Sequence, residues 1–277
     1  YLVAVFIQLM FIGNLSMKKT LIALAVAASA VVSGSAMASG WEQNGNGTSV
    51  EIGGTLQPVA KVTPWEVKTG NAVTNLNAQV QKGQTSVTVN VNQAIPVLGI
   101  RTTAANKTFY GQDGIAPRID YGNAIDLDKG SFSVFPLTLS VMDNSGDEIG
   151  TLTTNMFSAA VVSRLNSGDM FSAFAYEGNG NYAFKGGING PVVNYSEAVS
   201  RLNALDSTLA ANFEEQGAKD VGNWRSPNFS DSNESYSAFY GSGIESGEVI
   251  KINLSTAVSG NSDITWKASL PVTVTYM

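Results

Sequence analysis

The stretch Leu137-Thr138-Leu139-Ser140-Val141 alternates apolar and polar residues, and the sequence after it turns the chain back on itself. Alternation with a period of two predicts a β-strand with one buried face. Asp143-Asn144-Ser145-Gly146 has the composition of a tight turn, and Ile149 to Thr154 resumes as a partner strand. These segments predict an antiparallel hairpin and therefore a β-rich fold.

The same alternation recurs on both sides of this hairpin. Residues 87–91 and 250–254 each place an aliphatic side chain at every second position. Residues 131–134 also alternate, but in the opposite phase to the hairpin strand. We therefore expect a bulge at Phe135-Pro136, where proline removes a ladder donor. Short strands separated by Gly and Asn turns indicate a mostly β sandwich.

The middle of the chain has a different period. Between Ser196 and Gln216 the apolar residues follow helical spacing, Asn194 and Glu197 form a capping-box-like start, and Gly217 is a plausible stop. We also expect a shorter helix over Asp169 to Tyr176. A helix-bearing insertion of about residues 166–217 then interrupts the β-rich frame.

The N-terminal region has the three-part layout of a secretory signal over Met17 to Ala38. A basic start precedes an apolar run too short to span a membrane, and small residues mark the cleavage site. We expect residues 1–16, which precede this start, to be translated upstream sequence. Residues 39–53 form a polar, Gly-rich arm, and residues 54–277 form one domain.

Composition excludes several classes of function. The net charge is −6 and no basic stripe occurs, so binding to nucleic acid is not expected. The chain contains neither cysteine nor histidine, which removes disulfides, thiolate nucleophiles and the usual hydrolytic triads. We expect neither a cofactor nor a metal site.

The C-terminus is the most informative segment. Leu270, Val272, Val274 and Tyr276 alternate with polar residues up to the chain end. Such a strand is suited to pairing with a strand from another chain, although an ordinary final strand has the same pattern. The arm before residue 54 carries Trp41, Val50 and Ile52 on a polar background, so that it either orders in a groove or is a mobile leader.

Two further groups of residues allow two interpretations each. Aromatic residues gather in and after the insertion, where they form its core or bind the apolar face of a sugar beside Asn, Asp and Glu. Asp126 and Asp128 would share one face of a strand and could act as an acid/base pair, as in a secreted carbohydrate-active enzyme. Their alternative interpretation is that both are solvated turn charges.

Several segments together resemble the FaeG-like major fimbrial subunits of enteric bacteria. They are the leader from Met17, the exit Ile52-Gly53-Gly54 from the arm, the segment Pro64-Trp65-Glu66-Val67-Lys68-Thr69-Gly70 and the ending Leu270–Tyr276. The resemblance extends over residues 17–277, with a loose match in the middle. The leader is weakly specific, whereas the Trp65 segment and the ending together are more specific.

The resemblance implies an incomplete immunoglobulin-like β-sandwich that lacks its last strand, together with a helix-containing receptor-binding insertion. A periplasmic chaperone and then an outer-membrane usher would handle the subunit. Identical subunits would polymerise by donor-strand exchange, with Trp41, Val50 and Ile52 in the donor strand and Leu270, Val272, Val274 and Tyr276 beside the groove.

In this family the major subunit is also the adhesin, which implies a non-enzymatic protein of the cell surface that binds host carbohydrate. A purely structural pilin is the alternative within the same assembly class. The loop and short helix before Ser196 supply the expected carbohydrate-binding residues, which are Phe171, Phe174, Tyr176, Glu177, Asn179, Tyr182 and Lys185.

Overall fold

The computed structural model describes residues 43–44, 50, 52–58, 62–175 and 180–277. The chain divides into two compact units, Tyr1–Pro58 and Val59–Met277. Every strand and helix of the described residues lies in the second unit. Among these residues no helix is both long enough and apolar enough to cross a membrane.

The described part of the chain is mostly β, as the alternating segments predict. Its elements are β1 (Trp65–Thr69), β2 (Ser86–Asn90), β3 (Ile95–Thr102), β4 (Phe109–Tyr110), β5 (Pro117–Asp120), β6 (Val134–Met142), β7 (Glu148–Arg164), β8 (Asp169–Ala173), α1 (Tyr195–Leu205), β9 (Lys219–Asp220), β10 (Ser235–Ile244), β11 (Val249–Leu254), β12 (Lys267–Ala268) and β13 (Thr273–Tyr276).

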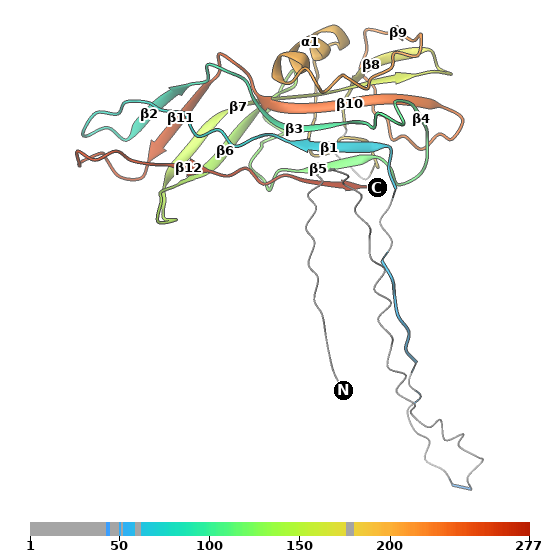
Figure 1. Ribbon diagram of the computed structural model, residues 1–277, viewed down its shortest axis with the longest axis horizontal. Helices are drawn as coiled ribbons and strands as arrows, with labels where there is room; N and C mark the ends of the chain where they lie inside the picture. Colours follow the sequence, from blue (N-terminus) through green and yellow to red (C-terminus); the bar gives the residue numbers. More distant parts are fainter. Residues whose placement is uncertain (1–42, 45–49, 51, 59–61, 176–179) are drawn as a thin grey trace, which may run out of the picture. The chain divides into compact units, whose positions relative to one another are not determined.

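The long strand β7 joins two halves of the main sheet. Its first half pairs with β6 and β11, and its second half pairs with β10 and β8, all antiparallel. The sheet order is β1-β3-β10-β7-β11-β2, while β5 and β13 form a separate two-stranded sheet. Figure 1 shows β2, β11 and β12 toward one end of this unit, β8 and β9 toward the other, and α1 between them.

The predicted hairpin is present, but the prediction of a bulge at Phe135-Pro136 is wrong. β6 pairs with β7 without interruption there, from Val134 opposite Phe157 onward, and the register shifts only between Val141 and Met142. The change of phase arises because residues 131–134 are a tight turn, in which Phe132 has a φ of 49°. The sequence pattern alone could not distinguish a turn from a bulge.

The predicted helix exists but is shorter than its apolar spacing suggested. α1 begins after Asn194, whose side chain accepts from the Glu197 N–H at 3.0 Å, and it ends at Leu205. Asp206 stops it, because its carboxylate accepts from the Thr208 N–H at 2.9 Å and thereby stabilises a turn. Leu209 still packs in the same apolar cluster as Leu202 of the helix.

The second expected helix, over Asp169 to Tyr176, is wrong. Asp169–Ala173 is strand β8, which pairs with the end of β7 from Arg164 opposite Asp169 to Ala160 opposite Ala173. Five residues carry too little periodicity to separate helix from strand, and the ladder offered by β7 decides the outcome. The insertion therefore adds a strand to the sheet as well as a helix.

Two apolar clusters bury the faces of the main sheet. α1 covers one face, with Ala198, Leu202 and Leu205 packed beside Phe157 and Phe239. The larger cluster takes alternate residues of the same strands β7 and β10 together with residues of other strands. It includes an aromatic group of Trp65, Phe109, Phe184, Phe229 and Tyr236. Most of the aromatic residues that the structure describes therefore serve the core.

The segment Pro64–Gly70 forms edge strand β1. The Trp65 indole N–H donates to the Ile115 carbonyl at 2.6 Å, which anchors the strand in the core. At its end, a Cβ on Gly70 would come within 1.8 Å of the Pro96 carbonyl oxygen, so only glycine allows the two backbones to approach this closely. The chain then leaves the sheet and runs along a groove.

Candidate functional site

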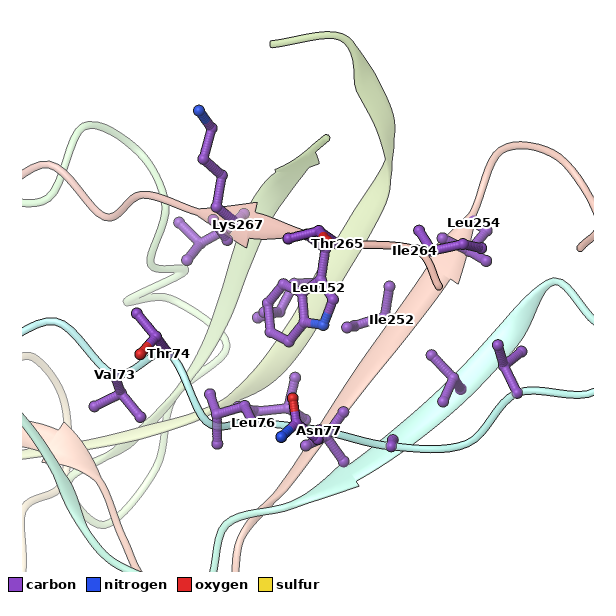
Figure 2. A pocket seen from close by; sticks show the side chains of 18 of the residues that line it. Val73, Thr74, Leu76, Asn77, Leu152, Ile252, Leu254, Ile264, Thr265 and Lys267 are labelled. Atoms are coloured by element: carbon purple, nitrogen blue, oxygen red, sulfur yellow. The ribbon is translucent and has the colours of Figure 1, made fainter. Parts of the chain in front are cut away.

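An open apolar groove of about 1500 Å³ lies among the described residues of the second unit. Residues 69–82 form one rim and residues 258–272 form the other, and its floor comes from β2, β3, β6, β7 and β11. Figure 2 shows Leu76 and Asn77 on one rim, Thr265 and Lys267 on the other, and Ile252 between them.

The floor of the groove is built by the period-two pattern of its strands. Ile250 and Ile252 are 1% and 2% exposed, and Leu254 continues their face at the end of β11. Leu152 of β7 lies opposite Ile252 in the ladder and lines the same cavity. Because these side chains are aliphatic, the floor favours an apolar occupant over a polar one.

Both rims carry backbone groups without backbone partners. Within the described residues, the Asn77 N–H to the Asn75 carbonyl is the one backbone–backbone hydrogen bond of residues 71–80, and residues 269–272 make none. Unpaired N–H and C=O groups along an extended segment can pair with an added strand. The groove thus presents apolar side chains at its floor and hydrogen-bonding groups at its edges.

The C-terminal strand lies at the second rim. β13 pairs with β5, with Val274 opposite Ile119 and Tyr276 opposite Pro117, and no other described strand pairs with it. Leu270, Val272, Val274 and Tyr276 are half-buried and pack against the larger apolar cluster, while the residues between them are exposed. Leu270 and Val272 also line the groove.

The predicted donor residues belong to the other unit. Val50 and Ile52 lie in no helix or strand, and their side chains are 84% and 95% exposed. Leu56, also 95% exposed, extends the apolar side chains of this segment. Trp41 lies outside the described residues.

The predicted carbohydrate residues have different surroundings. Phe171 is 1% exposed in the core, with the guanidinium of Arg164 5.4 Å from its ring, so it cannot stack on a sugar, and we remove it from the site. Phe174, Tyr182 and Lys185 are partly exposed. Tyr176, Glu177 and Asn179 lie outside the described residues.

Residues 225–227 connect the segments that carry these side chains. The Phe174 N–H donates to the Arg225 carbonyl at 3.0 Å, and the Ala183 N–H donates to the Pro227 carbonyl at 2.8 Å. The backbone of Lys185 in turn pairs with the backbone of Arg118 in β5 as an isolated parallel β-bridge. The tertiary structure therefore brings Phe174, Tyr182 and Lys185 onto neighbouring segments, although no regular strand joins them.

An ion-pair cluster fixes the beginning of this region. Asp169, the first residue of β8, accepts from Arg164 at 2.7 and 2.6 Å and from Arg225 at 3.0 Å. The hydrogen bond from Arg164 holds the pKa of the Asp169 carboxyl below its ordinary value, while burial opposes the shift. The carboxylate therefore stays charged and ties the residue 225 segment to β8.

Sequence reasoning left one exposed aromatic residue of this region out of the site. Trp224 is 44% exposed and contacts Phe174 with ring centroids 6.1 Å apart. It lies in no recognisable motif, and only its aromatic type marked it in the sequence. The contact with Phe174 is what places it beside the expected site.

The expectation for Asp126 and Asp128 rests on a strand that is not there. Both lie in an irregular segment between β5 and β6. Asp126 pairs with Lys129 at 2.8 Å, and the hydrogen bond from Lys129 lowers the pKa of the carboxyl. A carboxyl held ionised in this way does not act as a general acid near neutral pH, and no described cluster of acidic residues could hold a metal ion.

Comparison with known proteins finds similarity over most of the chain. Residues 17–277 match a family model described as "Fimbrial, major and minor subunit". The F41 fimbrial protein of Escherichia coli is 28% identical, over 94% of this chain and 100% of the relative. The K88 fimbrial proteins AC and AB of Escherichia coli are 30% and 31% identical at the same coverage.

Proposed function

Since the chain belongs to the family of major and minor fimbrial subunits, we propose that it polymerises by donor-strand exchange into a surface fimbria that binds host carbohydrate. The observation that carries the assembly part is the apolar groove between residues 69–82 and 258–272. Its floor is aliphatic and its rims have free backbone groups, which together suit an incoming alternating strand.

The proposed occupant is the arm of a neighbouring subunit. Val50 and Ile52 alternate with polar residues and are exposed, so burial in a groove would remove their side chains from water. Such burial is worth about 1.5–3 kcal/mol for each side chain. Because donor and acceptor differ, the contact is head-to-tail and propagates as a filament.

Transit to the cell surface requires that the groove be covered before assembly. We propose that a periplasmic chaperone supplies a temporary strand along Leu270–Tyr276, and that an outer-membrane usher exchanges it for the arm. Among the described strands only β5 pairs with β13, and Val272, Val274 and Tyr276 are half-buried, which supports this assignment.

Receptor binding is proposed for the surface around Phe174, Tyr182 and Lys185. Partly exposed aromatic rings beside a cationic side chain suit the mixed apolar and polar surface of a sugar. Tyr176, Glu177 and Asn179 stay in the proposed site on sequence grounds.

The assembly proposal is tested by expressing residues 39–277 in the periplasm together with a fimbrial chaperone, with and without residues 41–53. We expect a one-to-one complex with the chaperone in both cases, and fibres only when the arm is present. A chain that is stable alone, and that polymerises equally well without residues 41–53, would contradict the proposal.

A matched pair of substitutions separates the groove from general destabilisation. Leu254→Asn places a polar group at the half-buried end of the floor, whereas Val249→Asn changes a 43% exposed residue at the other end of the same strand. We expect fibre yield to fall for the first variant and to be unchanged for the second.

The receptor proposal has its own test, because a purely structural pilin would assemble equally well. Fibres of the wild type and of Tyr182→Ala are compared for attachment to enterocytes, with fibre length and number measured first. Lower attachment at equal fibre number supports an adhesin. Attachment by neither fibre, at normal assembly, would identify a purely structural subunit.

A further inference from the structure

Trp224 has an exposed indole that nevertheless contacts a neighbouring aromatic ring. Its side chain is 44% exposed, whereas Trp65 of the core is 6% exposed. Phe174 meets it with ring planes at 77°, an edge-to-face contact that fixes the orientation of the rings while leaving indole surface open to solvent.

The backbone around Trp224 is anchored on its C-terminal side. The Arg225 N–H donates to the Ser172 carbonyl at 3.3 Å, and the Arg225 carbonyl accepts from the Phe174 N–H. The Arg225 side chain pairs with Asp169, which is 5% exposed. An aromatic ring on a fixed backbone loses little conformational entropy when it binds a ligand, and this is the property of a preorganised contact.

We propose that Trp224 is a sugar-stacking residue of the receptor site, with its indole against the C–H face of a pyranose ring and Phe174 as its support. This inference rests on the proposed carbohydrate-binding function. The exposed polar residues Lys219, Asp220 and Asn223, close to Trp224 in sequence, supply donors and acceptors for sugar hydroxyls.

The location of Trp224 keeps this role separate from assembly. Trp224 comes after β9 in the chain, and Figure 1 places β8 and β9 toward the opposite end of the Val59–Met277 unit from β2, β11 and β12. The groove residues do not include Trp224 or Phe174. A change of the indole should therefore leave polymerisation intact.

The test uses purified fibres and beads that carry galactose-, glucose- or mannose-terminated oligosaccharides. Trp224→Ala is expected to reduce the retained fibre roughly tenfold or more, and Trp224→Phe less, because a phenyl ring keeps part of the stacking surface. Phe132→Ala is the matched control, since Phe132 is an aromatic residue 61% exposed on the turn before β6.

A second readout compares the wild type with the conservative variant, which keeps an aromatic ring at residue 224. In wild-type fibres, binding of the retained oligosaccharide should reduce acrylamide quenching of tryptophan fluorescence, and Trp224→Phe should abolish that protection. Protection that persists in Trp224→Phe would overturn the inference.

Each remaining outcome has a distinct meaning. Equal retention of wild-type and Trp224→Ala fibres overturns the role of Trp224 and leaves carbohydrate binding in place. Retention of neither, with normal assembly, overturns the carbohydrate-binding function itself. If Trp224→Ala and Trp224→Phe subunits bind chaperone normally but form no fibres, then the indole is a contact between subunits, and the inference is wrong.

Discussion

At the scale of single residues, Arg201 links the helix to the rest of the fold. Its guanidinium donates to both Glu245 oxygens at 2.9 and 2.6 Å, and its Cζ lies 3.9 Å from the centroid of the Phe157 ring. Lysine can reproduce neither the two parallel hydrogen bonds nor the stacking.

We therefore expect Arg201→Lys to lower the free energy of unfolding by about 1–3 kcal/mol. Urea unfolding of wild-type and variant subunits in the same assembly state measures the difference. Lys219→Arg, on the short strand β9, is the control and should change nothing. An unchanged urea midpoint for Arg201→Lys would show that the ion pair contributes no net stability.

Asp169 makes the stability of the fold depend on pH in the acidic range. Its folded pKa is lowered, chiefly by the hydrogen bond from Arg164, so its contribution to stability is present above the unfolded value of about 4. That contribution is lost as the pH falls through the lowered folded pKa.

We expect Asp169→Asn to be less stable than the wild type at pH 7, and the difference to shrink below about pH 4. Thermal unfolding as a function of pH measures this. Asp126→Asn removes a more exposed ion pair, which solvent screens, and should have a smaller effect at every pH. If the difference in stability between wild type and Asp169→Asn stays constant down to about pH 2, the titration of Asp169 is not coupled to folding.

At the scale of elements, α1 depends on its cap. The Asn194 carboxamide accepts from the Glu197 N–H, which would otherwise lack a partner at the first turn. We expect Asn194→Ala to cost about 1 kcal/mol of stability and Asn194→Asp to cost little, because aspartate caps equally well. The same urea titration measures both, and equal losses for the two variants would argue against a capping role.

The turn between β7 and β8 depends on one buried carboxylate. Glu234, 5% exposed, accepts from the backbone N–H groups of Asn166 and Ser167 at 2.7 and 3.0 Å, and from the Ser167 hydroxyl at 2.6 Å. Its removal takes the carboxylate partner from two backbone N–H groups and one hydroxyl of the turn.

We expect Glu234→Ala to speed amide hydrogen exchange at residues 166–167 and to lower stability by about 1–3 kcal/mol. Glu248→Ala, which removes a more exposed carboxylate just before β11, serves as the control. If exchange at the turn is unchanged in Glu234→Ala, water has replaced the carboxylate and the turn does not depend on it.

At the scale of the whole molecule, the open groove predicts that a strand fused to the same chain can complete the fold. Fusing residues 41–56 after Met277 through a flexible linker should give a monomer that no longer polymerises. Burial of Val50 and Ile52 alone should add roughly 3 kcal/mol to the free energy of unfolding, before the entropic cost of ordering the segment is subtracted. Analytical ultracentrifugation and thermal unfolding measure both effects.

The control is the same fusion with Val50 and Ile52 replaced by Ser. It should be no more stable than the chain without the fused segment. If the serine fusion and the apolar fusion unfold at the same temperature, the groove does not receive this segment, and another occupant must complete the fold.

The sequence by itself determined the mostly β class, the hairpin around Asp143–Gly146 and the inward-facing residues of the C-terminal strand. Each is a consequence of a period of two over several residues, which local chemistry imposes whatever the neighbours are. It also located the one described helix, because a cap and a helical spacing coincide there.

Only the tertiary structure decided the rest. Five residues from Asp169 form a strand because β7 offers them a ladder, and Phe171 is core because the sheet buries that face. The groove joins residues 69–82 with 258–272, and Trp224 contacts Phe174 from a distant part of the chain. Contacts between segments so far apart in sequence depend on how the strands pair and close, and no local sequence pattern encodes that.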